Sequence, residues 1–269
     1  IGVLALYSAA GGRPDPWAAR HAVRYGAALC ILLAVCLVHP KVWLYLAWPI
    51  YIISILLLVA VDVVGKVGMG AQRWLILGPI QIQPSEITKV AVILVIARYY
   101  HGLSHEQAAR FLYALPPLFV VLAPVGLVMV QPDLGTAMMV LLGGAALLFV
   151  AGVRIWMFLA AAVAAVGSLP FAWSFMHEYQ RRRVLTFLDP DRDPLGAGYH
   201  ITQSKIAIGS GGLFGKGFGH GTQSALNFLP EKQTDFIFTT FVEEWGMVGA
   251  LVLLGLFALV LLWGFSIAL

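Results

Sequence analysis

Glu86 and Lys89 are the first residues of this sequence whose types and spacing could support chemistry. They lie three positions apart in the motif QPSEITK at residues 83–89. Pro84 suits the first turn of a helix, and the i, i+3 spacing places both charges on one helix face. Two interpretations stay open: a Ser85 cap with a surface ion pair, or a charged pair facing a water-filled cavity. Ionisable residues at membrane depth are costly, which favours the second.

Two further motifs carry a cation and a carboxylate. Arg73 lies in GAQRW at residues 70–74, and Asp133 lies in QPDLGT at residues 131–136. Arg73 fits a lipid-headgroup contact beside an interfacial tryptophan as well as it fits a site. Asp133 starts a predicted helix, so a plain N-cap explains it at least as well as a functional role.

Asp235 stands in LPEKQTDFIF at residues 229–238, at the expected membrane edge before the last apolar segment. A carboxylate between Thr234 and an aromatic run is expected to be partly desolvated, which favours proton uptake and suits a general base. An N-cap for the following helix is about as compatible with the same residues.

The glycine-rich stretch GSGGLFGKGFGHG at residues 209–221 does not match a nucleotide-binding loop. A Walker A motif needs glycine where Ser210 stands and a hydroxyl residue where Gly217 follows Lys216. The pattern G-x-G-x-x-G also fails, because His220 occupies the last glycine position. We therefore expect no nucleotide cofactor.

The composition shows what kind of scaffold must position these residues. Of the 269 residues, 60% are hydrophobic and only 11% are charged, whereas soluble domains carry about 25% charged residues. The net charge of +4, without long runs of one sign, argues against a nucleic-acid partner. The length leaves room for about eight spans of ~20 residues. We predict an all-α polytopic membrane protein, a bundle of about eight transmembrane helices.

The hydrophobic pattern divides the chain into apolar spans and one long polar connection. The predicted spans are residues 1–9 (partial), 22–39, 42–63, 84–100, 111–130, 136–152, 155–175 and 240–266. The connection over residues 176–239 contains enough aromatic and aliphatic side chains to be an ordered cap and not a disordered loop. Both ends of the sequence lie in apolar runs, so we expect residues 1–269 to be a single membrane domain truncated at both ends.

Taken together, these motifs resemble the SEDS family, the integral-membrane peptidoglycan glycosyltransferases, which usually have about ten spans. The resemblance is carried by GAQRW, QPSEITK, QPDLGT and LPEKQTDFIF, together with RRRVLTFLDPDRDPLGAGYH at 181–200 and QSKIAIGSGGLFGKG at 203–217. Three shorter segments resemble the RodA branch, which serves elongation, more than the FtsW branch, which serves division: Val61-Asp62, HGTQS at 220–224 and EEWG at 243–246.

The resemblance implies a reaction and roles for individual residues. The expected activity is polymerisation of lipid II, an undecaprenyl pyrophosphate-linked disaccharide pentapeptide, into β-1,4 glycan strands for cell elongation and rod shape. Asp235 corresponds to the family's essential carboxylate in a large extracytoplasmic loop, here residues 176–239, and is the expected general base. Further functional motif positions fall on Arg73, Glu86, Lys89 and Asp133. Positive charge must meet the departing pyrophosphate, and the candidates are Arg73, Lys89, Arg181 and Arg183.

The resemblance also implies a cation, partners and a location. A divalent cation, Mg²⁺ or Mn²⁺, is expected to help, although the sequence shows no ligand cage and Asp235 is the one ligand candidate. The expected partners are a class B penicillin-binding protein and the elongation machinery. The expected location is the bacterial inner (cytoplasmic) membrane, multi-pass, with the active site facing the periplasm. A lipid II flippase or transporter, a division polymerase of the FtsW type and a non-catalytic scaffold are the alternatives.

Overall fold

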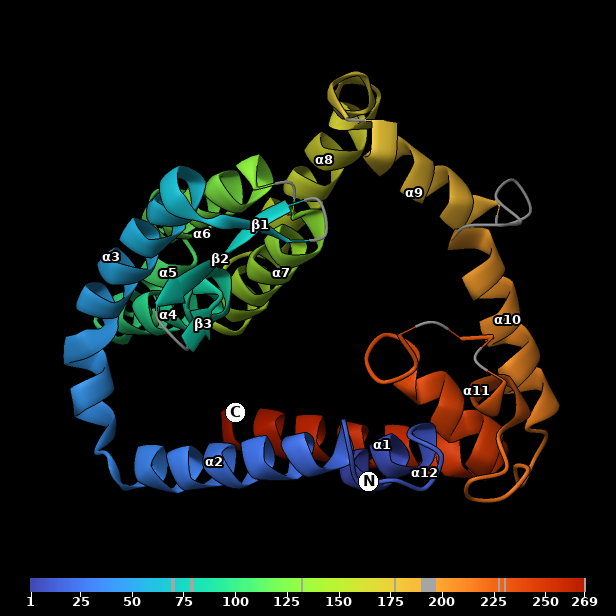
Figure 1. Cartoon of the computed structure of the whole chain (residues 1–269). Coiled ribbons are helices and arrows are strands. Elements are labelled where there is room, and N and C mark those ends of the chain that lie inside the picture. Colours follow the sequence, from blue (N-terminus) through green and yellow to red (C-terminus); the bar gives the residue numbers. More distant parts are fainter. Residues whose placement is uncertain are drawn as a thin grey trace. The chain divides into compact units, whose positions relative to one another are not determined.

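The computed structural model describes residues 1–68, 71–77, 80–131, 133–176, 178–189, 197–226, 228–229 and 231–268. Over these residues the chain is mostly helical, with one small sheet (Figure 1). The predicted helical class is therefore confirmed. The sheet was not predicted.

The elements follow one another in this order. The helices are α1 (Gly2–Ala9), α2 (Ala18–Leu37), α3 (Pro40–Val64), α4 (Pro84–His101), α5 (His105–Ala108), α6 (Phe111–Val130), α7 (Leu134–Val150), α8 (Ile155–Phe175), α9 (Glu178–Leu188), α10 (Ala197–Ser210), α11 (Thr222–Ala225) and α12 (Ile237–Ala268). The strands are β1 (Lys66–Gly68), β2 (Ala71–Leu77) and β3 (Ile80–Ile82).

Each predicted span coincides with a helix, from α1 through α4, α6, α7 and α8 to α12. Within the described residues, four of these helices are long and apolar enough by themselves to cross a membrane: Ala18–Leu37, Pro40–Val64, Phe111–Val130 and Ile237–Ile267. Two further apolar helical segments are shorter: Leu134–Val150, which is α7, and Ile155–Phe171, within α8. Prolines lie inside α3, α6 and α8, as membrane helices tolerate when neighbouring groups satisfy the freed carbonyls.

The chain divides into two compact units, which are described separately. The central unit is Cys36–Pro170, and the terminal unit combines Ile1–Val35 with Phe171–Leu269. The boundaries between the two units fall within α2 and α8.

The central unit is built on α3, α4, α6 and α7, whose buried aliphatic side chains form one core. Two hydrogen bonds, one part-buried and one buried, connect α3 with the α6 region. The Tyr51 hydroxyl donates to the Val120 carbonyl at 3.0 Å, and Gln131 Nε2 donates to the Leu58 carbonyl at 3.1 Å. Gly144 lets α7 approach α6 closely, because a Cβ there would lie 2.5 Å from Val121 Cγ2.

The small sheet of the central unit has the order β1-β2-β3 with antiparallel pairing throughout. Leu75 of β2 pairs with Ile82 of β3 and is buried. Strand β2 contacts both α3 and α4. The sheet therefore supports Arg73, which β2 carries, against the helical core.

In the terminal unit, α12 packs against α1 and α10 and is broken at Gly246. Gly246 has φ 66° and ψ −167°, so the backbone leaves the helix there and then resumes it. The glycine-rich loop supplies partners to the interrupted helix. Backbone N–H groups of Lys216 and Gly217 donate to the carbonyls of Glu243 and Glu244, both at 3.0 Å. In return, the N–H groups of Met247 and Val248 donate to the carbonyls of Gly212 and Leu213.

This exchange explains the glycine-rich composition. Gly215 has φ +79°, and a Cβ there would lie 2.0 Å from the Glu244 carbonyl oxygen. A broken membrane helix needs partners for its freed backbone groups, and here the closely approaching loop provides them.

The long connection over residues 176–239 is helical over much of its described part and leads into α12 at Ile237. It contains α9, α10 and α11, and α10 packs against α9, α11 and α12. Residues 177, 190–196, 227 and 230 of this connection lie outside the described residues.

Candidate functional site

Arg73 and Asp133 form an ion pair between β2 and the start of α7. Arg73 Nε lies 3.3 Å from Asp133 Oδ2. Asp133 is also the N-cap of α7, since it accepts hydrogen bonds from the Thr136 backbone N–H at 3.3 Å and from the Thr136 hydroxyl at 2.9 Å. The N-cap interpretation of Asp133 is thus confirmed, and the same carboxylate also orients the Arg73 guanidinium.

Glu86 and Lys89 form a second ion pair on the first turns of α4. Lys89 Nζ lies 2.8 Å from Glu86 Oε2, and the Glu86 side chain is 57% exposed. A pair this exposed contributes only about 0.3–0.5 kcal/mol to stability. Pro84 occupies the first turn as predicted, but the Ser85 cap is wrong. Gln83 holds the cap position, and Ser85 is a buried residue inside the helix.

The elements that carry these two pairs adjoin one another. Helix α4 packs against both β2 and α7 within the central unit. The structure therefore gathers four sequence-predicted residues onto neighbouring elements of one unit: Arg73, Glu86, Lys89 and Asp133.

Asp235 belongs to the terminal unit and lies in the turn that leads into α12. The turn is closed by the Thr234 N–H, which donates to the Glu231 carbonyl at 3.0 Å. Helix α12 begins at Ile237, so the residue directly before it, at the cap position, is Phe236 and not Asp235. The N-cap interpretation is therefore wrong. The side chain is exposed, in contrast to the partial desolvation expected from the neighbouring aromatic residues.

Arg181 has a structural explanation at the end of α8. Its Nε donates to the Trp173 carbonyl and its Nη2 donates to the Ser174 carbonyl, both at 2.9 Å. The guanidinium also lies over the Trp173 ring, 5.9 Å from the centroid. Arg181 thus caps the C-terminus of α8. The side chain of Arg183, the other predicted arginine, lies outside the described part of the structure.

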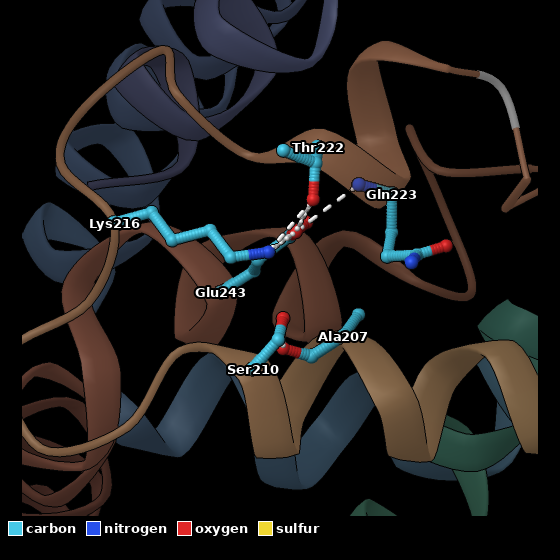
Figure 2. Close-up of polar contacts among 6 residues, drawn as sticks. All are labelled: Ala207, Ser210, Lys216, Thr222, Gln223 and Glu243. Carbon is cyan, nitrogen blue, oxygen red and sulfur yellow. Dashed lines mark hydrogen bonds and ion pairs between the residues drawn. The ribbon is translucent and has the colours of Figure 1, made fainter.

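A buried polar cluster that no sequence motif indicated surrounds Glu243, on the first turns of α12. Figure 2 shows the Lys216 ammonium and the Glu243 carboxylate pointing toward each other, with Nζ 2.6 Å from Oε1. The Thr222 hydroxyl and the Gln223 backbone N–H also donate to Oε1, both at 3.1 Å. Glu243 is fully buried, so one carboxylate fastens the glycine-rich loop and α11 to α12.

The neighbouring carboxylate, Glu244, is tied to α1. The Ser8 hydroxyl donates to Glu244 Oε1, and the Gly219 backbone N–H donates to the same side chain. A cavity of about 390 Å³ opens beside it within the terminal unit, lined among others by Arg13, Trp17 and Lys232. Burial lowers the pKa of the Lys232 ammonium.

One signal in the sequence could have drawn attention to this cluster. Glu243 and Glu244 are adjacent acids within the predicted last span, and acids inside a span need partners. Lys216 as the partner could not be inferred, because it lies 27 positions away in the chain.

The described residues do not form a complete metal-binding site. Within the described ranges, no group of three or more His, Cys, Asp or Glu side chains could hold a metal ion. Asp235 offers one exposed carboxylate. Mg²⁺ is usually bound through one or two carboxylates plus substrate phosphates, so Asp235 could supply one ligand but not a complete site.

Comparison with known proteins assigns the chain to a family. The family model for cell cycle proteins of the FtsW, RodA and SpoVE type matches residues 2–269. The chain belongs to the FtsW/RodA/SpoVE family. This membership and the long apolar helices make it a multi-pass membrane protein.

Curated members of the FtsW/RodA/SpoVE family are similar over most of this chain. Peptidoglycan glycosyltransferase MrdB of Escherichia coli (strain K12) is 49% identical over 248 residues, covering 89% of this chain and 65% of MrdB. Probable peptidoglycan glycosyltransferase FtsW of Aliivibrio salmonicida is 40% identical over 250 residues, covering 93% of this chain and 62% of that protein. The chain thus spans just under two thirds of the length of these relatives.

Solved structures of the family share the fold. A peptidoglycan synthase complex, described as coordinating polymerization and crosslinking, contains a chain with TM-score 0.77 and 35% identity, covering 96% of this chain and 71% of that one. The rod shape determining protein RodA of Thermus thermophilus has TM-score 0.63 and 33% identity, covering 96% of this chain and 67% of that one.

Proposed function

We propose that this chain is the membrane core of a peptidoglycan glycosyltransferase that polymerises lipid II into β-1,4 glycan strands for cell elongation and rod shape. The observation that carries the proposal is the 49% identity to the peptidoglycan glycosyltransferase MrdB over 89% of the chain. The lower identity to FtsW, 40%, favours the elongation role over the division role.

In the proposed reaction, the 4-hydroxyl of an incoming lipid II attacks the anomeric carbon of the growing strand. The bond to the pyrophosphate carrier breaks with inversion, so an α-linked donor becomes a β-1,4 linkage. Pyrophosphate is already a good leaving group, so the paired acid and base of glycoside hydrolysis are not needed. One base suffices to accept the hydroxyl proton.

Asp235 is the proposed base. Its carboxylate is exposed, so it is accessible to a sugar hydroxyl. The turn before α12 holds its backbone in place. Proton abstraction requires a base within hydrogen-bond reach of the hydroxyl, and an accessible carboxylate on a fixed backbone supports this role for Asp235.

Arg73 and Lys89 are the proposed contacts of the pyrophosphate. Asp133 orients Arg73 at 3.3 Å, and Glu86 orients Lys89 at 2.8 Å. Charge-assisted hydrogen bonds from such cations stabilise the developing negative charge. Arg181 is left out of this role because two of its nitrogens already donate to α8 carbonyls.

A divalent cation, Mg²⁺ or Mn²⁺, would find its candidate protein ligand in Asp235. Bound there, it would neutralise part of the diphosphate charge.

Partners and orientation complete the proposal. The similarity to a chain of a peptidoglycan synthase complex supports assembly with a class B penicillin-binding protein that crosslinks the product, within the elongation machinery. The residues of the site would face the periplasm from the bacterial inner membrane, where lipid II is presented.

Purified full-length protein and fluorescent lipid II test the proposal. Polymerised glycan on a gel is the expected result, with an increase when the penicillin-binding partner is added. A parallel liposome assay measures lipid II flipping. Flipping without polymer would instead identify a transporter, and neither activity would identify a scaffold.

A further inference from the structure

The turn that carries Asp235 is attached to the interior of the terminal unit by a lysine. Lys232 lies three positions before Asp235, and its Nζ donates to the Ser224 carbonyl at 2.8 Å. Within the turn, the N–H groups of Thr234 and Phe236 both donate to the Glu231 carbonyl, at 3.0 and 3.4 Å. Glu231 adopts φ 50°. Lys232 and Asp235 therefore belong to one hydrogen-bonded turn, and the lysine side chain links this turn to α11.

The Ser224 carbonyl, which accepts the hydrogen bond from Lys232, is itself held in place. Ser224 is buried and lies in α11, one residue after Gln223. The Gln223 N–H and the Thr222 hydroxyl donate to buried Glu243 of α12 at 3.1 Å. A continuous series of hydrogen bonds thus connects α12 through α11 to Lys232 and to the Asp235 turn.

We infer that Lys232 is a positioning residue for Asp235, and this inference rests on the proposed function. The lysine ammonium fixes the turn against the Ser224 carbonyl and thereby sets where the carboxylate meets the acceptor hydroxyl. A displacement of about 1 Å in such a group can lower the rate roughly 10²-fold. Burial lowers the pKa of Lys232, which places its ammonium in a partly desolvated part of the unit, where the hydrogen bond to the Ser224 carbonyl is shielded from water.

A second role is available to the same side chain, because Lys232 also lines the 390 Å³ cavity beside Glu244. A lysine that only bound substrate from that cavity would act on KM. A lysine that positions the base acts on kcat. The two roles are therefore separable by steady-state kinetics.

The experiment compares wild type, Lys232→Met, Lys232→Arg and Asp235→Asn in the full-length protein, with Lys41→Met as the matched control. Lys41 is an exposed lysine at the start of α3 in the central unit. Initial rates of lipid II polymerisation are measured over a range of lipid II concentrations. We expect Lys232→Met to lower kcat roughly 10- to 100-fold with KM within about twofold of wild type. Lys232→Arg should keep most of kcat, since a guanidinium can reach the same carbonyl, and Lys41→Met should match wild type.

Two results would overturn the inference: wild-type kcat in Lys232→Met while Asp235→Asn is inactive, or a change in Lys232→Met confined to KM. No polymer from wild type, or normal polymer from Asp235→Asn, would instead remove the proposed function or its base. Should Lys232→Met not purify as a monodisperse protein, Lys232→Gln, which keeps a donor of shorter reach, is judged by the same kcat criterion.

Discussion

The Lys216 ammonium lies 2.6 Å from the fully buried Glu243 carboxylate, and this pair joins the glycine-rich loop to α12 (Figure 2). Glu243 lies three residues before Gly246, where the helix is interrupted. The loop also exchanges four backbone hydrogen bonds with the same stretch of α12. The loop thus supplies hydrogen-bond partners to the backbone groups freed at the interruption. The Lys216–Glu243 ion pair holds this loop against the helix.

Lys216→Met should destabilise the protein by about 3 kcal/mol, because removing one partner leaves a buried carboxylate uncompensated. Thermal unfolding in detergent, followed by tryptophan fluorescence, measures the loss. Lys205→Met, at an exposed lysine of α10, is the control and should melt like wild type. Adding Glu243→Gln should restore part of the loss, since the amide oxygen still accepts from Gln223 without a buried charge. A Lys216→Met protein as stable as wild type would show that the pair contributes little.

Gly215→Ala should prevent folding or destabilise the protein by more than about 3 kcal/mol. The new Cβ would lie 2.0 Å from the Glu244 carbonyl oxygen at a residue with φ +79°, and both effects oppose an alanine there. Gly209→Ala is the matched control, because its Cβ would meet nothing within 4 Å and alanine favours the α10 helix by about 0.5–1 kcal/mol. Yields of monodisperse protein and melting temperatures report the difference. Equal behaviour of the two variants would contradict the close loop–helix contact.

Asp133→Asn should cost less stability than Asp133→Ala, by about 1 kcal/mol, because asparagine can still accept from the Thr136 N–H as an N-cap. Both variants lose the charge contact with Arg73. A double-mutant cycle of Asp133→Asn with Arg73→Gln should give a coupling of about 0.5–1 kcal/mol, typical of a partly exposed pair. Zero coupling would mean that the carboxylate acts as a cap alone.

The positions of the spanning helices could be predicted from the sequence because each is a long apolar run bounded by polar residues. The last span, predicted over 240–266, is α12 at Ile237–Ala268. The sheet could not be predicted, since β1 and β3 have only three residues each and such short strands carry no periodicity. The break at Gly246 could not be predicted either, because it depends on a loop that packs against the helix.

Part of the candidate site could be predicted from the sequence, where local spacing decides which residues meet. The contacts that depend on the fold could not. Glu86 and Lys89 could be paired from local spacing alone, as i, i+3 neighbours on one helix. The contact of Arg73 with Asp133 joins residues 60 positions apart by their numbers, and the sequence named both without pairing them. The hydrogen bond from Lys232 to Ser224 depends on the fold of the connection between α10 and α12, which no motif describes.

The proposed role of the Asp235 carboxylate as the base of a lipid II polymerase is tested most directly by Asp235→Asn. The substitution keeps the size of the side chain and removes its basicity. The matched control is Glu106→Gln, the same chemical change at an exposed carboxylate of α5. Full-length wild type, Asp235→Asn and Glu106→Gln are each incubated with fluorescent lipid II, and binding and glycan polymer are measured. We predict that Asp235→Asn binds lipid II like wild type and makes no polymer, while Glu106→Gln makes normal polymer. Glycan of normal amount and length from Asp235→Asn would contradict it.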